Sequence, residues 1–429
     1  MEEKEGDIQM AGFRVLGGES INGAVALDAA KNAVLPILAA SILPEGDVTL
    51  RRCPDIRDVH AMAQILRMLG CDAVWTRGEM RIHNDRMRKW EMPDDLSKQI
   101  RSSIFLLGPI LARLRRATVT YPGGCEIGIR PIDLHIKGLK ALGVRIVDAG
   151  GVLYCDGREM HAGNVYLDYP SVGATENVMM AATLLHGVTT IHNAAREPEI
   201  EDLQRFVNSM GGKVRGAGTQ LIEIEGVEKL HGVSYTPIPD RIVGGTLLCA
   251  AAITGGSIQL TGARPCDLIP VTSKLQEMGC RVRIKKSAVW LEAPERLSAF
   301  SQLQTQPHPG FPTDMQAQML AVSCVARGTS VIVENVFENR FAHVADLCRM
   351  GANIRVSGRT AVVQGVEMLG GMRVTARDLR GGAALVLAGL RAQGETIVER
   401  AELIDRGYAH LENTLTALGA KIERINDEK

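Results

Sequence analysis

Apolar and polar positions along this chain form a pattern that returns six times. Each time, a segment with helical spacing ends in Leu or Met followed by Gly, and a stretch of alternating polar and apolar residues comes next, as is typical of a half-buried strand. The glycines are Gly70, Gly143, Gly211, Gly279, Gly351 and Gly419. Their separations of 73, 68, 68, 72 and 68 residues indicate a repeated structural unit.

A second pattern keeps the same period. It is an apolar segment rich in Ala or Gly, followed by a strand rich in β-branched residues. The apolar segments begin at Lys31, Ser102, Gly173, Gly244, Thr313 and Arg380. Each is apolar on nearly every side, which predicts a helix that is buried all round. The sequence therefore predicts an α/β protein of two domains, each with three repeated units whose sheets surround the helices.

The boundary between the two sets of three units is expected near residues 236–241, where Pro237 and Pro239 flank a short connection. A length of 429 residues also favours two or three domains over one. The strands expected within residues 12–25 belong to no unit, and their pattern allows packing on either domain.

Residues 121–143, YPGGCEIGIRPIDLHIKGLKALG, join a glycine-rich loop to a predicted helix. The loop contains Cys125 and Arg130, and Pro131 and Asp133 are typical of a first helical turn. Backbone amides at the amino end of a helix favour an anion, and the same positive field favours the thiolate form of Cys125. The sequence therefore predicts a usable acid, base or nucleophile in this loop. The alternative is a glycine-rich turn with an inert cysteine.

The predicted buried helices are apolar except at their starts, where charged residues occur. If the units are arranged alike in both domains, these starts face one another across an interdomain cleft. The cations are Lys31, Arg101, Arg130, Arg340, Arg380 and Arg406, and the carboxylates are Asp314 and Asp378. The set predicts a pocket for a polyanion that closes when substrate neutralises the repulsion. For any single member, the competing interpretation is a solvated charge at a helix end.

Composition narrows the classes of function. Lys plus Arg and Asp plus Glu both number 49, so no overall field attracts nucleic acid or an anionic membrane. The acidic start MEEKEGD is unlike a signal peptide, and the apolar run over residues 33–43 is too short for a membrane span. Nine cysteines without CxxC spacing argue against zinc and disulfides and fit a reducing cytosol. His135 and His343 have no metal-binding spacing and are expected to be structural.

Ten motifs of the chain resemble those of the UDP-N-acetylglucosamine 1-carboxyvinyltransferases, a family of enolpyruvyl transferases. They are AAKNAVLPILAAS, IRSSIFLLGP, PGGCEIGIRPIDLH, SVGAT, NAAREPEI, PDRI, HPGFPTDMQAQ, VFENRF, DLRGGAALVLAG and IDRGY, and the resemblance covers residues 13–424. It implies an inside-out α/β barrel in two domains with pseudo-threefold symmetry. Residues 29–238 would form the first domain, with the Cys125 loop, and residues 1–28 and 239–429 the second. The active site would lie in the cleft between them.

The resemblance also implies a reaction. The enolpyruvyl group of phosphoenolpyruvate would pass to the 3′-hydroxyl of UDP-N-acetylglucosamine, with release of phosphate through a tetrahedral intermediate. Cys125 would protonate C3 of phosphoenolpyruvate and would also be the thiol that fosfomycin alkylates. Asp314 would take the proton of the attacking hydroxyl, while Lys31 and Arg406 would stabilise developing charge.

Substrate-binding residues follow from the matched motifs. Those implied for phosphoenolpyruvate are Lys31, Asn32, Arg101, Arg130 and Arg406. Those implied for UDP-N-acetylglucosamine are Asn32, Arg101, Arg130, Pro131, Ile132, Asp133, Leu134, Ser171, Gly173, Asp314, Val336 and Arg340. Asp378 and Arg380 match a supporting motif near the reacting centre. No metal and no cofactor is implied.

Departures from the family pattern leave every catalytic group in place. They are Glu126 after the thiol, Asp28-Ala29 before Ala30-Lys31, and Val243-Gly244-Gly245 after the PDRI motif.

Two alternative functions stay open: a related shikimate-type transferase and a catalytically weak regulatory paralogue. The expected partners are the two small-molecule substrates, with no nucleic acid and no membrane. The expected setting is a cytoplasmic monomer or weak homodimer at the first committed step of peptidoglycan precursor synthesis.

Overall fold

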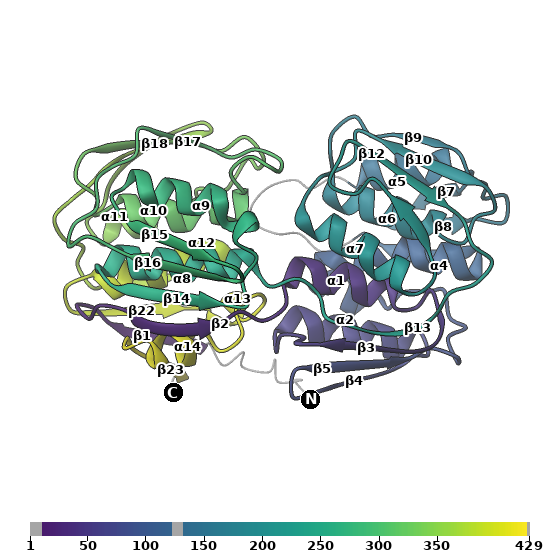
Figure 1. Ribbon diagram of the computed structural model, residues 1–429, viewed down its shortest axis with the longest axis horizontal. Coiled ribbons are helices and arrows are strands. Elements are labelled where there is room, and N and C mark those ends of the chain that lie inside the picture. The colour runs from purple at the N-terminus through teal and green to yellow at the C-terminus, as the bar shows by residue number, and fades with distance from the viewer. Residues whose placement is uncertain (1–10, 122–131, 427–429) are drawn as a thin grey trace, which may run out of the picture.

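The computed structural model describes residues 11–121 and 132–426 and has two lobes side by side (Figure 1). Buried apolar residues form a separate cluster in each lobe. One cluster draws on residues 29–238, and the other on residues 13–27 and 242–422. The expectations for Cys125, Glu126, Arg130 and Pro131 concern positions outside the described residues.

Three sheets belong to the first lobe of the described chain. In spatial order the first contains β13 (His231–Tyr235), β3 (Glu45–Arg51), β5 (Glu79–His83) and β4 (Asp72–Thr76). The second contains β6 (Arg116–Thr120), β8 (Val152–Asp156) and β7 (Arg145–Ala149). The third contains β11 (Lys213–Arg215), β12 (Leu221–Glu225), β10 (Val188–His192) and β9 (Asn164–Tyr166).

Three further sheets belong to the second lobe. The first contains β15 (Arg281–Lys285), β16 (Ala288–Glu292), β14 (Ser257–Thr261) and β2 (Asn22–Ala26). The next contains β17 (Gln302–Gln304), β18 (Thr329–Val333), β20 (Thr360–Gln364) and β19 (Asn353–Ser357). The last contains β21 (Arg373–Thr375), β22 (Glu395–Glu399), β1 (Ala11–Leu16) and β23 (Lys421–Asn426). The sequence prediction of a mixed α/β protein is therefore confirmed.

Helices fill the middle of each lobe, with strands toward the outside (Figure 1). The first lobe contains α1 (Lys31–Ala40), α2 (Arg57–Met68), α3 (Asp94–Gln99), the 3₁₀ helix η1 (Arg101–Leu106), α4 (Leu107–Leu114), α5 (Asp133–Ala141), α6 (Val172–Ala182) and α7 (Pro198–Ser209). The second contains α8 (Arg241–Thr254), α9 (Pro265–Glu277), the 3₁₀ helix η2 (Thr313–Met315), α10 (Gln316–Ser323), α11 (Val344–Arg349), α12 (Leu379–Arg391), α13 (Ala401–Ile404) and α14 (Leu411–Ala417).

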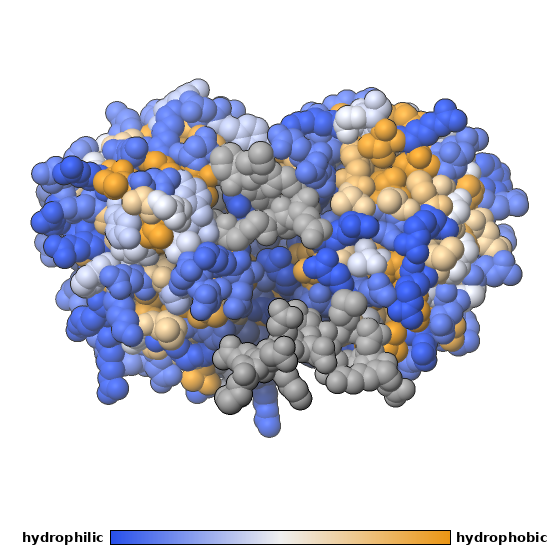
Figure 2. All heavy atoms as spheres, turned by 180° about the vertical axis from the view of Figure 1, so that it is seen from behind, coloured by the Kyte–Doolittle hydropathy of each residue, from blue (hydrophilic) through white to orange (hydrophobic). Residues whose placement is uncertain are grey.

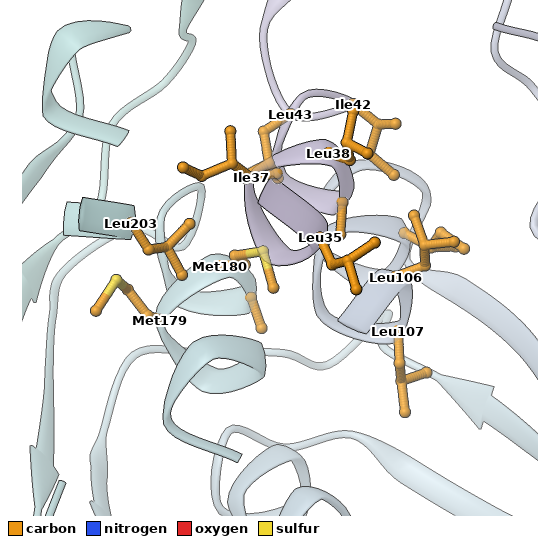
Figure 3. Close-up of a cluster of buried hydrophobic side chains, with 14 of the residues drawn as sticks. Leu35, Ile37, Leu38, Ile42, Leu43, Leu106, Leu107, Met179, Met180 and Leu203 are labelled. Carbon is orange, nitrogen blue, oxygen red and sulfur yellow. The ribbon is translucent and has the colours of Figure 1, made fainter. Parts of the chain in front are cut away.

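Burial explains this arrangement. All residues of α10 are buried, whereas β14 and β18 alternate buried and more exposed positions, so one face of each strand meets the helices. In the first lobe, Leu35 and Leu38 of α1 lie close to Leu106 and Met180, which come from η1 and α6 (Figure 3). Helices covered on every side need no polar face, which is why they are apolar all round.

The six glycines of the repeated pattern share one conformation. Each follows a helix whose C-cap is Leu or Met, and each has a φ between 82° and 100°. This left-handed region is costly for other residues, so glycine ends these helices and turns the chain into the next strand.

Two predicted apolar helices differ in detail from the expectation. The segment that begins at Ser102 is divided between η1 and α4, and the segment that begins at Thr313 starts as η2 before α10. In both, the first turn is 3₁₀, a tighter form that is common at helix ends. The tight turn places Arg101 and Asp314 at the lobe interface.

The chain crosses between the lobes twice, and the two crossings run side by side. Ala30 N donates to Ile238 O at 2.7 Å, and Asp240 N donates to Asp28 O at 2.9 Å. The Asp240 carboxylate also accepts from the backbone N of Lys31 at 3.0 Å and from the first amides of α8. Asp240 therefore links the starts of α1 and α8, one in each lobe.

Candidate active site

A cavity of about 540 Å³ lies between the lobes and is lined by residues of both. From behind, the furrow between the lobes has hydrophilic residues along its walls outside the part that the grey atoms cover (Figure 2). The volume is typical of a site for a small-molecule ligand.

The structure brings most of the sequence-predicted site residues together in this cavity. Those that line it are Lys31, Asn32, Arg101, Asp133, Leu134, Ser171, Gly173, Asp314, Val336, Arg340, Asp378, Arg380 and Arg406. Ile132 is buried and is not among the lining residues. Cys125, Arg130 and Pro131 lie outside the described part of the chain.

One buried carboxylate joins two cations from opposite lobes. Lys31 Nζ at the start of α1 lies 2.7 Å from Asp58 Oδ2 on α2. Arg406 of the second lobe donates from Nε to Asp58 Oδ1 at 2.9 Å and from Nη2 to Oδ2 at 3.3 Å. Because one negative charge faces two positive ones, this group leaves a positive excess for an anionic ligand.

Burial and neighbouring charges set the protonation of this group. Burial lowers the pKa of Lys31, and the positive charges of Arg380 and Arg406 add to the shift, while Asp58 opposes it. Burial acts to raise the pKa of Asp58, but Lys31 and Arg406 outweigh it and hold that pKa below its ordinary value. Asp58 therefore stays ionised and fixes both cations.

A second carboxylate, Asp314 in η2, is held by two arginines. Arg340 Nη2 donates to Asp314 Oδ1 at 2.7 Å, and Arg380 Nη2 donates to Oδ2 at 3.0 Å. Asn32 reaches the same Oδ2 from the first lobe at 3.4 Å. The Asp314 side chain is 24% exposed, so a ligand in the cavity can reach it.

The start of α12 fixes Arg380. Asp378 caps this helix, since its Oδ1 accepts from the backbone N of Arg380 at 2.9 Å and of Gly381 at 3.0 Å. The Arg380 guanidinium lies 5.5 Å from the centre of the Tyr408 ring, a cation–π distance. Burial opposes the charge on Arg380, but Asp314 outweighs it and raises the pKa of the guanidinium. Arg380 is therefore a rigid, permanently charged support for Asp314.

The amino end of α6 forms another wall. Ser171 caps the helix by accepting from Ala174 N at 3.4 Å. A Cβ atom on Gly173 would come within 2.9 Å of His135 Cε1, so the close approach of α5 and α6 requires glycine there. His135 Nδ1 lies 2.7 Å from Asn177 Nδ2, and burial together with Arg101 lowers the pKa of His135 to about 4. His135 is therefore a neutral structural group beside the cavity.

Sequence reasoning missed an acidic wall that also lines the cavity. Glu199 accepts from Arg241 Nε at 3.0 Å and from Nη2 at 3.2 Å. Glu197 Oε1 accepts from the backbone N of His308, across the lobe interface, at 3.2 Å. The motifs NAAREPEI and PDRI contain these three charged side chains, so a signal was present. Asp58 and Glu176 are single charged residues within predicted helices. The sequence around them does not indicate which other side chains they contact.

Two further findings concern the described residues alone. Within residues 11–121 and 132–426, no group of three or more His, Cys, Asp or Glu side chains is placed to hold a metal ion. In the same part of the chain, no helix is both long enough and apolar enough to cross a membrane.

Comparison with known sequences places the chain among transferases. The family model of EPSP synthase (3-phosphoshikimate 1-carboxyvinyltransferase) matches residues 15–415. UDP-N-acetylglucosamine 1-carboxyvinyltransferase 2 of Caldanaerobacter subterraneus is 50% identical over 416 residues, which are 97% of this chain and 100% of that relative. UDP-N-acetylglucosamine 1-carboxyvinyltransferase 1 of Symbiobacterium thermophilum is 52% identical over 420 residues, which are 96% of this chain and 95% of that relative.

Solved structures share the fold. The enolpyruvyl transferase NikO from Streptomyces tendae has a TM-score of 0.89 at 24% identity, covering 98% of this chain and 100% of that one. EPSP synthase from Acinetobacter baumannii has a TM-score of 0.73 at 18% identity, covering 97% and 100%. The two-lobed chain therefore has the fold of the enolpyruvyl transferases. With relatives near 50% identity over nearly their full length, the chain belongs to the UDP-N-acetylglucosamine 1-carboxyvinyltransferase family.

Proposed function

We propose that this protein transfers the enolpyruvyl group of phosphoenolpyruvate to the 3′-hydroxyl of UDP-N-acetylglucosamine and releases phosphate. The observation that carries the proposal is the meeting of two charge clusters in one cavity. Lys31 and Arg406, joined by Asp58, provide positive charge, and Asp314, held by Arg340 and Arg380, provides a carboxylate. An anionic substrate and an alcohol that must lose a proton require this combination.

Phosphoenolpyruvate would bind at the cationic cluster. Lys31 and Arg406 are already held in place by Asp58, so little reorganisation is needed when the substrate phosphate or carboxylate arrives. Arg101 lines the same cavity at the start of η1 and would contact the substrate from the first lobe, as would Asn32 and Arg130. A tight cluster of cations offsets the charge of the phosphate and carboxylate groups together.

The acid and base steps follow from the chemistry of the two substrates. Asp314 accepts the proton of the 3′-hydroxyl as its oxygen bonds to C2 of phosphoenolpyruvate, while Cys125 delivers a proton to C3. The product of this addition is a tetrahedral intermediate that carries both the phosphate and the sugar oxygen on C2. Loss of a proton from C3 and of phosphate from C2 then restores the double bond as an enol ether.

The sugar nucleotide would lie along the other wall of the cavity. Ser171 and Gly173 are at the amino end of α6, where free backbone amides suit a diphosphate. Asp133 and Leu134, with Pro131 and Ile132, would lie toward the uridine, and Val336 and Arg340 toward the sugar. Bound in this way, the sugar nucleotide would have its acceptor hydroxyl beside Asp314.

The deciding experiment measures phosphate release with each substrate alone and with both together. We expect release only when both are present, and release from phosphoenolpyruvate alone would contradict the proposal. The same assay separates a regulatory paralogue, which would release no phosphate under any of these conditions.

A cysteine variant tests the assigned acid. Cys125→Ala should lose most turnover and resist fosfomycin while it still binds UDP-N-acetylglucosamine in calorimetry, because the thiol acts on the other substrate. Cys348→Ala is the matched control, since Cys348 is exposed and does not line the cavity. It should keep both turnover and fosfomycin sensitivity. Full activity of Cys125→Ala would contradict the proposal that the Cys125 thiol is the general acid.

A second candidate is transfer of the enolpyruvyl group to a phosphorylated shikimate. The description of the matching family model favours it. Against it stands the identity of about half of all positions to UDP-N-acetylglucosamine 1-carboxyvinyltransferases. Phosphate release with 3-phosphoshikimate in place of the sugar nucleotide would establish this second function, and we expect none.

We further propose the domain boundaries, the barrel architecture and the cellular setting of the protein. The two apolar clusters support a division into residues 29–238 and residues 1–28 with 239–429. The buried helices and outer sheets support an inside-out barrel of three repeated units in each lobe. The reaction would open peptidoglycan precursor synthesis in the cytoplasm, in a monomer or weak homodimer.

A further inference from the structure

Glu176 on α6 is a buried acid in the wall of the cavity. Its side chain has no exposed surface, and it lines the cavity near Glu197 and Glu199. Neither of its two carboxyl oxygens has a hydrogen-bond partner among the residues that the structure describes. Burying an ionised carboxylate without a partner is very costly, so this arrangement requires an explanation.

The neighbouring groups give Glu176 no counter-charge. Glu199 already receives both hydrogen bonds of the Arg241 guanidinium, and Glu197 receives the backbone N of His308. The Arg241 guanidinium is therefore engaged by Glu199 and makes no hydrogen bond to Glu176. The lack of any partner fits an uncharged Glu176, whose O–H would be a hydrogen-bond donor without an acceptor among the described residues.

We propose, on the basis of the function proposed above, that Glu176 is a specificity-determining residue that donates a hydrogen bond from its neutral carboxylic acid to a carbonyl oxygen of the sugar nucleotide. Glu176 lies three residues after Gly173, so both are on the same face of α6. The cations of the cavity that the structure places, Lys31, Arg101, Arg241, Arg340, Arg380 and Arg406, suit phosphate or carboxylate groups. A neutral donor suits an uncharged acceptor of the amide type and does not repel the diphosphate.

Electrostatics support the uncharged state. Burial raises the pKa of Glu176 well above its ordinary value, and Glu199 and Glu197 add to the shift. Charged and titratable groups of the described residues that line the cavity from elements packed against α6 are Glu199 on α7, Asp133 and His135 on α5, and Arg101 on η1. His135 is neutral at ordinary pH, with a pKa of about 4. Raising the pH should ionise Glu176, remove the donor and place a negative charge near the diphosphate.

The test compares binding of UDP-N-acetylglucosamine to three variants by calorimetry, which does not depend on turnover. Glu176→Leu keeps the approximate size but removes the donor, and we expect Kd to rise about tenfold. Glu176→Gln keeps an N–H donor and should bind several times more tightly than Glu176→Leu. Thr189→Val is the matched control, because Thr189 is also buried with an unpartnered hydroxyl but lies on β10 outside the cavity lining. It should leave Kd unchanged.

The carbonyl that accepts the hydrogen bond belongs either to the acetamido group or to the uracil ring, and a second ligand distinguishes the two. UDP-glucose has the uracil carbonyls but no acetamido group. If Glu176→Leu weakens UDP-N-acetylglucosamine but not UDP-glucose, the acceptor is the acetamido oxygen; if both weaken alike, it is uracil. Either result supports the proposal. A Kd for UDP-N-acetylglucosamine within twofold of the wild type in Glu176→Leu overturns it, as does a Glu176→Gln variant that binds no better than Glu176→Leu.

Kinetics distinguish binding from a general loss of structure. In Glu176→Leu we expect KM for UDP-N-acetylglucosamine to rise with KM for phosphoenolpyruvate unchanged. In the wild type, Kd for the sugar nucleotide should rise with pH as Glu176 ionises, and this rise should be absent in Glu176→Gln. An equal rise in both proteins would overturn the proposal. Failure of the wild type to release phosphate would instead refute the proposed function, because the binding comparison stands apart from turnover.

Discussion

At the residue scale, Asp58 shows how one side chain can serve both lobes. It is almost fully buried, and it bonds Lys31 from its own lobe and Arg406 from the other. Removal of one partner from such a group leaves the remaining charges buried without compensation, which is far more costly than loss of an exposed pair. The same contact therefore bears on stability and, under the proposed function, on the position of the two cations that would bind phosphoenolpyruvate.

Asp58→Asn should lower the free energy of unfolding by about 3–5 kcal/mol at neutral pH, because Lys31 and Arg406 then repel each other. The folded-state pKa of Asp58 is lowered, so its contribution is present above the unfolded-state pKa. That contribution is lost as the pH falls through the folded-state pKa. Chemical denaturation across the acid range should show that the difference between wild type and variant shrinks toward low pH.

Asp346→Asn offers a comparison within the same experiment. Asp346 is buried and pairs with Arg349 at 2.8 Å, but it does not line the cavity. We expect this variant to lose stability without a change in KM for phosphoenolpyruvate, whereas Asp58→Asn should change both. Equal KM values for the two variants would show that Asp58 has no part in placing the cations.

Single residues also mark the limit of what the sequence could predict. Lys31, Asp314 and Arg406 were identified because they stand at the starts of apolar helices or in recognisable motifs. Asp58 stands in an ordinary amphipathic helix, where a charge is expected on the solvent side. Its burial depends on Lys31 and Arg406, which are far apart in the chain, and no local pattern carries that information.

At the element scale, the cavity is built from helix starts. Asp240, Asp378 and Ser171 cap α8, α12 and α6, and each of these helices begins at or near the lobe interface. A capping side chain satisfies backbone amides that would otherwise lack partners, so it fixes where the first turn lies. The charged residues of that turn are then aimed into the cavity.

Asp378→Ala should lower the free energy of unfolding by about 1 kcal/mol and reduce turnover, because Arg380 loses its fixed position beside Asp314. Ser171→Ala should cost less stability, since the capping distance of 3.4 Å is longer than the 2.9 Å and 3.0 Å made by Asp378. Thermal unfolding and steady-state kinetics of both variants provide the check. Unchanged turnover in Asp378→Ala would mean that other contacts suffice to hold Arg380.

Helix ends were more accessible to sequence analysis than helix beginnings. Glycine at Gly70 or Gly279 is required by a positive φ, and that requirement is visible in the sequence as Leu or Met before Gly. The 3₁₀ turns of η1 and η2 leave no comparable mark, because almost any residue tolerates them. The sequence therefore located these helices but not the form of their first turns.

At the scale of the whole molecule, two separate apolar cores face one shared cavity. Each lobe has an apolar core of its own, and polar contacts such as those of Asp58 with Arg406 and of Glu199 with Arg241 join the two lobes. Folded-state ligands stabilise a protein according to their concentration relative to Kd. A ligand that touches both lobes should therefore couple their unfolding.

UDP-N-acetylglucosamine at one hundred times its Kd should raise the free energy of unfolding by about 2.7 kcal/mol. Scanning calorimetry should show two overlapping transitions without ligand and a single, higher transition with it, because a ligand bound as proposed above would contact both lobes. A ligand that raised only one of the two transitions would bind to one lobe alone.

The pairing of β1 also has a consequence for synthesis of the chain. Phe13 in β1 pairs with Arg424 in β23 and with Val398 in β22, so β1 lies between two strands that are synthesised only after the whole of residues 29–238. Residues 29–238 contain every partner that their own sheets need, and a nascent chain of that length can complete its first lobe unaided. The partners of β1 in its sheet are absent until residues 395–426 have been synthesised. During that interval β1 is an unpaired strand, the kind of segment from which mispairing and aggregation start.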